Sequence, residues 1–227
     1  MNTESDRKLL REARERRDIL GLQALSPLSS AYLPWTVSSM RPSGVAAVLN
    51  EILVNRRRTI VELGGGISTC FIARLLSRLN GGHLWTVEHD ERWADFLESQ
   101  LTSEGLQQFV TVVRVSLEPV DSNWPGEENA WYQRKKLNTV LAGQSFDLLL
   151  IDGPPAYQAE WTHARYPAVP FFAPLLADDY AVILDDVDRA GEQDIMKRWE
   201  SEFDIKFQSR LIDGVIGIGR PRPAFTI

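Results

Sequence analysis

Three consecutive glycines, Gly64, Gly65 and Gly66, separate two segments of different periodicity. Residues 59–63 are β-branched or apolar and predict a strand, while apolar residues recur at helical spacing over residues 67–79. Glycines let the backbone turn tightly and approach a ligand closely, and the start of a helix offers free N–H groups. The sequence therefore predicts a ligand-binding turn between a strand and a helix.

An acidic residue accompanies this turn at the end of the next predicted strand. Glu88 follows an apolar run over residues 83–87. A carboxylate at such a position can accept both ribose hydroxyls of a nucleoside, as in dinucleotide-binding folds. The plainer alternative is that the glycines form only a tight connection and that Glu88 is an exposed strand end. The strand and helix around the turn favour a nucleoside cofactor.

Two residues beside the turn bear on the kind of nucleoside. Thr69 stands where a dinucleotide fingerprint has its third glycine. Glu62 places negative charge where a pyrophosphate would lie, and it suits a cationic ligand, such as a sulfonium that also carries an ammonium group. Both residues argue against NAD, although a NAD-type oxidoreductase with a degenerate fingerprint stays as an alternative.

The elements that must position these residues alternate between strand and helix. Further strands are expected over residues 109–115, 146–151 and 180–184. Two last strands, over 203–210 and 215–219, are joined by too few residues for a crossover helix, so they should pair antiparallel. The pattern predicts an α/β fold with a mostly parallel sheet that ends in an antiparallel hairpin.

Length and charge narrow the functional classes. The 227 residues suffice for one sizeable core, with residues 1–58 expected as a helical extension and cap and residues 59–227 as the cofactor-binding domain. A formal net charge of −6 argues against nucleic acid as a partner, because phosphate binding needs a basic face. The charge-rich residues 5–20 predict an amphipathic helix that packs on the body or on a second copy in a homo-oligomer.

The single cysteine and the apolar runs indicate a compartment. Cys70 cannot form a disulfide within the chain, which fits a reducing environment, and it is expected to be buried without a chemical role. The first 25 residues hold no apolar run of signal-peptide length, and no segment reaches the roughly 20 apolar residues of a membrane span. The sequence predicts a cytoplasmic protein that has no membrane partner.

Several of these segments resemble the class I S-adenosylmethionine-dependent methyltransferases. Residues 61–69, Val-Glu-Leu-Gly-Gly-Gly-Ile-Ser-Thr, resemble their motif I, and residues 87–90 resemble their acidic ribose-binding strand end. Residues 146–155 resemble motif IV of small bacterial members. The resemblance extends over residues 35–219. It implies a Rossmann-like fold with a mostly parallel seven-stranded sheet, and S-adenosylmethionine as the cofactor.

The resemblance also implies a role for individual residues. The methionine part of the cofactor would lie against the turn, at Glu62, Gly64, Gly65, Gly66, Ser68 and Thr69. The nucleoside part would lie against the next two strand ends, at Glu88 and His89 for the ribose and at Ser116 and Leu117 for the adenine.

A second acidic group follows the later strands. Asp152 ends one predicted strand, and Asp185 and Asp186 end the next, which is its neighbour in this fold. Close carboxylates call for a cation, and oxygen ligands favour Mg²⁺ or another hard divalent ion. The arrangement resembles the metal site of catechol-type O-methyltransferases, but that family's lysine has no counterpart in residues 153–155. Alternatively, Asp186 or Asp188 caps the next helix, and Asp152 faces the cofactor.

The sequence gives a less specific signal for the methyl acceptor than for the cofactor. Aromatic residues over 118–132 and 153–174 predict a pocket for a small-molecule or glycan-related acceptor, with transfer to oxygen. Asp152 and His163 are the candidate catalytic residues, the histidine as a general base. A surface histidine is the plainer interpretation of His163. A non-catalytic regulatory protein that retains the cofactor site is a further alternative.

Overall fold

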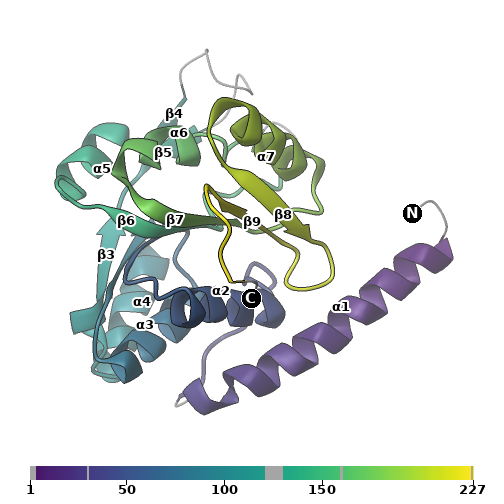
Figure 1. The fold of residues 1–227 in the computed structure, drawn as a ribbon. Helices are drawn as coiled ribbons and strands as arrows, with labels where there is room; N and C mark the ends of the chain where they lie inside the picture. The colour runs from purple at the N-terminus through teal and green to yellow at the C-terminus, as the bar shows by residue number, and fades with distance from the viewer. Residues whose placement is uncertain (1–3, 30, 121–129, 159–160, 226) are drawn as a thin grey trace.

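The computed structural model describes residues 4–29, 31–120, 130–158, 161–225 and 227. Its centre is a seven-stranded sheet, and a two-stranded antiparallel hairpin lies beside it (Figure 1). The strands of the large sheet are β1 (Thr59–Leu63), β2 (His83–Glu88), β3 (Val110–Arg114), β6 (Phe146–Ile151), β7 (Leu176–Leu184), β8 (Lys206–Arg210) and β9 (Ile216–Arg220). The hairpin consists of β4 (Leu117–Pro119) and β5 (Ala130–Tyr132).

The strand order is β3-β2-β1-β6-β7-β9-β8. The pairs from β3 to β7 are parallel, whereas β9 pairs antiparallel with both β7 and β8. The predicted Rossmann-like fold with a closing antiparallel hairpin is confirmed. Because the chain order reverses direction between β1 and β6, the carboxyl ends of these strands form the crevice where open α/β sheets bind ligands.

Helices cover both faces of the sheet (Figure 1). One face carries α2 (Pro42–Val54), α3 (Ile67–Leu79) and α4 (Glu91–Ser103), and the other carries α5 (Arg134–Val140), α6 (Ala168–Phe172) and α7 (Ala190–Glu202). Short 3₁₀ turns are η1 (Ser26–Leu28), η2 (Gln107–Phe109) and η4 (Ala173–Leu175). The residues of α2 belong to the same apolar core as β1 and α3, so this part of the N-terminal region packs directly on the sheet.

The sheet separates two apolar cores because side chains alternate along each strand. Along β6, Leu148 and Leu150 belong to the core under α2 and α3, while Leu149 and Ile151 belong to the core under α6 and α7. All four side chains are fully buried. A strand that is apolar on both sides is what a sheet covered on both faces requires.

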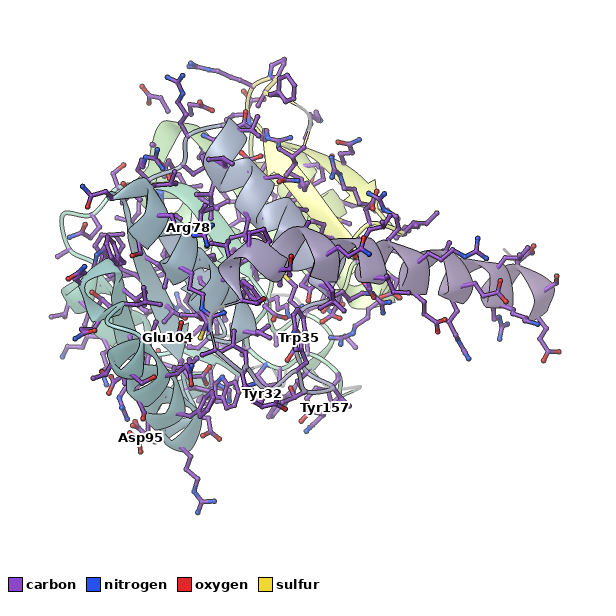
Figure 2. All side chains as sticks on the ribbon, turned by 90° about the horizontal axis from the view of Figure 1, so that it is seen from below. Tyr32, Trp35, Arg78, Asp95, Glu104 and Tyr157 are labelled. Carbon is purple, nitrogen blue, oxygen red and sulfur yellow. The ribbon has the colours of Figure 1, made fainter. Side chains whose placement is uncertain are left out.

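The N-terminal helix α1 (Glu4–Leu25) packs on α2 with its C-terminal half and extends beyond the rest of the molecule at its N-terminus (Figures 1 and 2). Asp18 accepts a hydrogen bond from the Ser43 hydroxyl at 2.6 Å, and Arg14 donates one to the carbonyl of Leu211 at 2.8 Å. Among the described residues, no helix is both long and apolar enough to cross a membrane.

Candidate active site at the carboxyl edge of the sheet

A cavity of about 860 Å³ lies at the carboxyl ends of β1, β2, β6 and β7. Its size is in the range that encloses a cofactor-sized ligand. One wall is formed by the glycine turn and the end of β2, and the opposite wall by the residues that follow β6 and β7. Residues 36–39 close it from the N-terminal region. The lining includes Gly64, Gly65, Gly66, Glu88, His89, Trp93, Tyr132, Asp152, Tyr157, Arg165, Asp185, Asp186 and Arg189.

The glycine turn approaches the loop after β6 at backbone distance. Gly64 has a φ of +85°, a conformation that side chains disfavour. A Cβ on Gly64 would lie 2.8 Å from the backbone nitrogen of Gly153, and a Cβ on Gly65 would lie 2.7 Å from Leu97. A Cβ on Gly66 would meet nothing nearer than Ser68 Oγ at 3.8 Å. The first two glycines are required by the fold, and the third leaves open space at the cavity.

Glu62 lies beneath this turn rather than on the cavity wall. Its fully buried carboxylate accepts hydrogen bonds from the hydroxyls of Ser68 at 2.5 Å, Thr69 at 2.5 Å and Thr86 at 2.7 Å. Burial raises the pKa of Glu62 to about 7, although these three hydroxyls lower it. The structure therefore places Glu62, Ser68 and Thr69 where they fix the turn, and none of the three lines the cavity.

Thr69 links this buried group to the start of α3. Its hydroxyl accepts a hydrogen bond from the backbone N–H of Gly66 at 2.9 Å, and it donates to Glu62. The position where a dinucleotide fingerprint would have glycine thus has a side chain that the turn needs.

Glu88 ties the end of β2 to the same turn. Its carboxylate accepts from the backbone N–H groups of His89 and Asp90, each at 2.7 Å, and from that of Gly65 at 3.1 Å. The hydrogen bond to Glu88 raises the pKa of His89, whose Nδ1 lies 3.0 Å from that carboxylate. Both residues line the cavity, as expected of the predicted ribose site.

Ser116 and Leu117 are not among the residues that line the cavity. The carbonyl of Ser116 accepts a hydrogen bond from Gln133, and Leu117 pairs with Tyr132 across the β4–β5 hairpin. Residues 118–132, whose aromatic side chains are predicted to line the acceptor pocket, form this hairpin at their described ends. Its aromatic residues are therefore buried, with Tyr132 reaching the cavity. Trp124, also assigned to the acceptor loop, lies outside the described residues.

The three aspartates converge as predicted. Asp152 and Asp185 follow adjacent strands, and their backbone N–H groups extend the ladders to Leu63 and Ile151. One carboxylate oxygen from each of Asp152, Asp185 and Asp186 lies within 4.8 Å of the others. Neither Asp186 nor Asp188 caps α7, which begins after Arg189 without a side-chain cap, and Asp188 pairs with Arg14 at 2.8 Å. Carboxylate oxygens are the type of ligand that hard cations bind.

Arginines already stand at this cluster. Arg165, whose side chain is 4% exposed, has its Nη2 3.1 Å from Asp186 Oδ2 and 3.5 Å from Asp152 Oδ1. It also donates to the backbone carbonyls of Asp152 at 2.6 Å and Asp185 at 3.2 Å. Arg189 lies 2.9 Å from Asp186. The guanidinium of Arg165 is therefore the counter-cation that the predicted acidic group requires.

Burial shifts the acid–base properties of this group. It raises the pKa of Asp152 to about 6, against the lowering effect of Arg165. It raises the pKa of Asp185 well above its ordinary value, and the charges of Asp152 and Asp186 add to that rise. With a pKa of about 6, Asp152 is mostly a carboxylate at the cavity near neutral pH.

His163 does not reach the cavity. Its Nε2 lies 2.9 Å from Asp194 of α7, and its Nδ1 lies 3.2 Å from the hydroxyl of Thr162.

Cys70 is buried in α3, and burial raises its pKa to about 12, which leaves the thiol protonated.

The comparisons with known proteins agree with this geometry. A family model described as a methyltransferase domain matches residues 61–187, which is more than half of the chain and includes both walls of the cavity. The chain belongs to this methyltransferase family. The prediction of a class I methyltransferase is confirmed. The matched segment begins in β1, just before the glycine turn, and ends just after β7, so its two ends lie at the two walls of the cavity. Among curated proteins, no match to this methyltransferase is found.

Solved methyltransferases share its fold over most of their length. An S-adenosylhomocysteine-bound methyltransferase from Podospora anserina is 11% identical, with a TM-score of 0.64 over 98% of this chain and 97% of the other. An O-methyltransferase from Bacillus cereus in complex with S-adenosylhomocysteine is 18% identical, with a TM-score of 0.59 over 88% and 89%. The O-methyltransferase TomG from Streptomyces achromogenes, in complex with S-adenosylmethionine, is 16% identical, with a TM-score of 0.55 over 90% and 88%.

Proposed function

We propose that this methyltransferase transfers a methyl group from S-adenosylmethionine to an oxygen atom of a small-molecule acceptor. The observation that carries the proposal is the cavity of about 860 Å³ in which the glycine turn and Glu88 face the Asp152 carboxylate. Similar structures of O-methyltransferases, one with S-adenosylmethionine and one with S-adenosylhomocysteine, support both the donor and the oxygen acceptor. The glycan-related acceptor is the narrower form of this hypothesis.

The residues of the cavity fit the donor. Gly66 leaves space beside the start of α3, and Glu88 presents acceptor oxygens at the end of β2. The carboxylates of Glu88 and Asp152 attract a ligand that carries sulfonium and ammonium charges. Beneath the turn, Glu62 holds the backbone that would contact the methionine part. S-adenosylmethionine, when bound, supplies an electrophilic methyl group.

Asp152 is the residue that we assign to acid–base chemistry. Its carboxylate lies at the cavity, and its raised pKa of about 6 leaves it ionised near neutral pH, yet more basic than an ordinary aspartate. It would accept the proton that an acceptor hydroxyl releases as its oxygen forms a bond to the methyl carbon. The bond from that carbon to sulfur breaks at the same time, which leaves S-adenosylhomocysteine and a methyl ether or ester.

The position of Arg165 argues against the hypothesis of a bound divalent ion. A divalent ion between Asp152 and Asp186 would have to displace or tolerate a guanidinium within 3.5 Å of both carboxylates. The site in its present arrangement therefore does not fit a resident Mg²⁺ ion. We propose that Arg165 supplies the positive charge there and that the reaction proceeds without a divalent ion.

A thermal-shift panel tests the donor. S-adenosylmethionine and S-adenosylhomocysteine should each raise Tm, since a ligand at 100 times its Kd adds about 2.7 kcal/mol of stability. NAD should have no effect, and a shift with NAD alone would replace the proposal with an oxidoreductase. Formation of S-adenosylhomocysteine with a panel of hydroxylated acceptors then tests catalysis. Binding without turnover over that panel would favour the regulatory alternative.

A chelator tests the metal. Wild-type Tm and turnover should be the same in EDTA and in Mg²⁺, whereas Arg165→Met should gain a Tm increase on addition of Mg²⁺ or Mn²⁺. Loss of wild-type turnover in EDTA, with recovery in Mg²⁺, would restore the divalent ion to Asp152, Asp185 and Asp186.

A further inference from the structure

Tyr132 is a buried residue of the cavity that the proposed chemistry does not yet use. It is the last residue of β5 and is fully buried, although it lines the cavity. Its ring lies 6.4 Å from that of His89 and 5.7 Å from that of Trp131. Within the described part of the chain, its hydroxyl has no hydrogen-bond partner. An unpaired buried hydroxyl is unfavourable, so such a group is normally satisfied by a ligand or water.

Two glycines leave the space that this hydroxyl occupies. A Cβ on Gly153 would lie 2.6 Å from the Tyr132 oxygen, and another on Gly64 would lie 2.8 Å from the nitrogen of Gly153. The hydroxyl is therefore held at the point where the turn after β1 meets the loop after β6. At this point the cofactor wall and the Asp152 wall of the cavity come together.

The charges around this point define the partner that the hydroxyl can take. Burial raises the pKa of Tyr132 well above its ordinary value, and the nearby carboxylates of Glu88 and Asp152 add to the rise, while Arg165 opposes it. The phenol stays protonated, so it can donate one hydrogen bond and accept another. A ligand group between these carboxylates and the phenol is favoured if it carries positive charge.

We propose that the Tyr132 hydroxyl hydrogen-bonds bound S-adenosylmethionine at its amino-acid half, and that Tyr132 thereby positions the donor between the two walls. This inference rests on the proposed function, because it names a further contact of the same cofactor. Tyr132 acts here as a positioning residue, and Asp152 retains the proton transfer.

The test compares two buried tyrosines whose hydroxyls face different surroundings. Tyr132→Phe removes the unpaired hydroxyl and keeps the ring. Tyr166→Phe removes a hydroxyl that donates to Glu202 at 2.5 Å, away from the cofactor wall. The affinity of each purified variant for S-adenosylhomocysteine and S-adenosylmethionine is measured by calorimetry, and the Tm of the ligand-free protein is measured beside it.

The two variants should give opposite results. Tyr132→Phe should weaken cofactor binding about 2- to 13-fold, which corresponds to one hydrogen bond of roughly 0.5–1.5 kcal/mol, and should leave the ligand-free Tm unchanged or higher. Tyr166→Phe should lower the ligand-free Tm and leave the affinity unchanged. If Tyr132→Phe lowers the ligand-free Tm with unchanged affinity, Tyr132 is structural and the inference is wrong. If the wild-type protein binds neither compound, the proposed function itself is overturned.

Discussion

The two walls of the cavity stabilise their carboxylates in different ways. On the glycine-turn wall, Glu88 accepts hydrogen bonds from three backbone N–H groups, and beneath this wall Glu62 accepts from three hydroxyls. On the opposite wall, Asp152 and Asp186 face the guanidinium of Arg165. Neutral dipoles solvate a negative charge without cancelling it, whereas an arginine cancels it.

Because of this difference, one wall can attract the cationic donor while the other provides the base for the reaction. Most of the charge of Glu88 stays available to a cationic donor, because it accepts mainly from neutral backbone N–H groups, with the ring of His89 as a titratable neighbour at 3.0 Å. The carboxylates beyond β6 and β7 are paired with arginines of the protein itself, so the cluster forms a fixed frame around Asp152. Variants that change one wall and leave the other intact test this division.

The largest loss of stability is expected at Arg165. Arg165→Met would remove a buried guanidinium from beside the partly buried carboxylates of Asp152 and Asp186, and would also leave two backbone carbonyls without their donor, at a cost of about 3–5 kcal/mol in the free energy of unfolding. Arg189→Met removes a guanidinium whose side chain is 37% exposed, and it should cost less than about 1 kcal/mol. Urea denaturation measures both. Equal small losses would show that Arg165 does not hold the cluster together.

Beneath the glycine turn, Glu62 should make the free energy of unfolding depend on pH. Its pKa is about 7 in the folded protein and 4.5 as the reference value, so folding takes up a proton between these pH values. The stability that Glu62 contributes is therefore greatest below pH 4.5 and falls as pH rises through 7, by on the order of 3 kcal/mol.

Glu62→Gln isolates this effect, because glutamine does not titrate while most other groups remain the same. At pH 4.5 the carboxyl of Glu62 is protonated in the folded protein and resembles the neutral amide, so the two proteins should have similar free energies of unfolding. As pH rises to 8, the wild type should lose stability relative to the variant by on the order of 3 kcal/mol. A difference that is constant over this range would contradict the raised pKa.

The glycines of the turn should respond unequally to a methyl group. Gly64→Ala introduces a side chain at a φ of +85° and at 2.8 Å from Gly153, so we expect a loss of about 2 kcal/mol. Gly66→Ala places its methyl in open space and should change stability by less than about 0.5 kcal/mol. It should instead weaken cofactor binding, because the methyl enters the cavity. Similar unfolding curves for the two variants would contradict this assignment.

The sequence was sufficient for the fold and for one wall of the site. Apolar runs such as residues 146–151 predicted the buried parallel strands, and the short connection before residue 216 predicted the antiparallel closure. The glycines and Glu88 were found because the turn and the strand end are local features. The convergence of Asp152, Asp185 and Asp186 followed from the neighbouring positions of two strands.

Other residues of the site could not be recognised locally. Arg165 comes from a turn between β6 and α6, and only the tertiary structure places it against carboxylates from two strands. Tyr132 was included among loop aromatics, because three-residue strands such as β4 and β5 are too short for a periodic signal. Ser116 and Leu117 were assigned to the adenine by resemblance alone, at a strand end where the chain instead turns into this hairpin.

The smallest effect is expected at His163, the candidate base that lies outside the cavity. His163→Ala removes contacts to Asp194 and Thr162 on the far side of the loop, so kcat should stay within about twofold and stability within about 1 kcal/mol. Asp152→Asn, its counterpart at the cavity, should lower kcat about 10²- to 10⁴-fold, because an amide cannot accept the acceptor's proton. Initial rates of S-adenosylhomocysteine formation compare the two variants. If His163→Ala lowers kcat as much as Asp152→Asn, the base lies on the loop that carries His163. The assignment of the base to Asp152 at the end of β6 is then wrong.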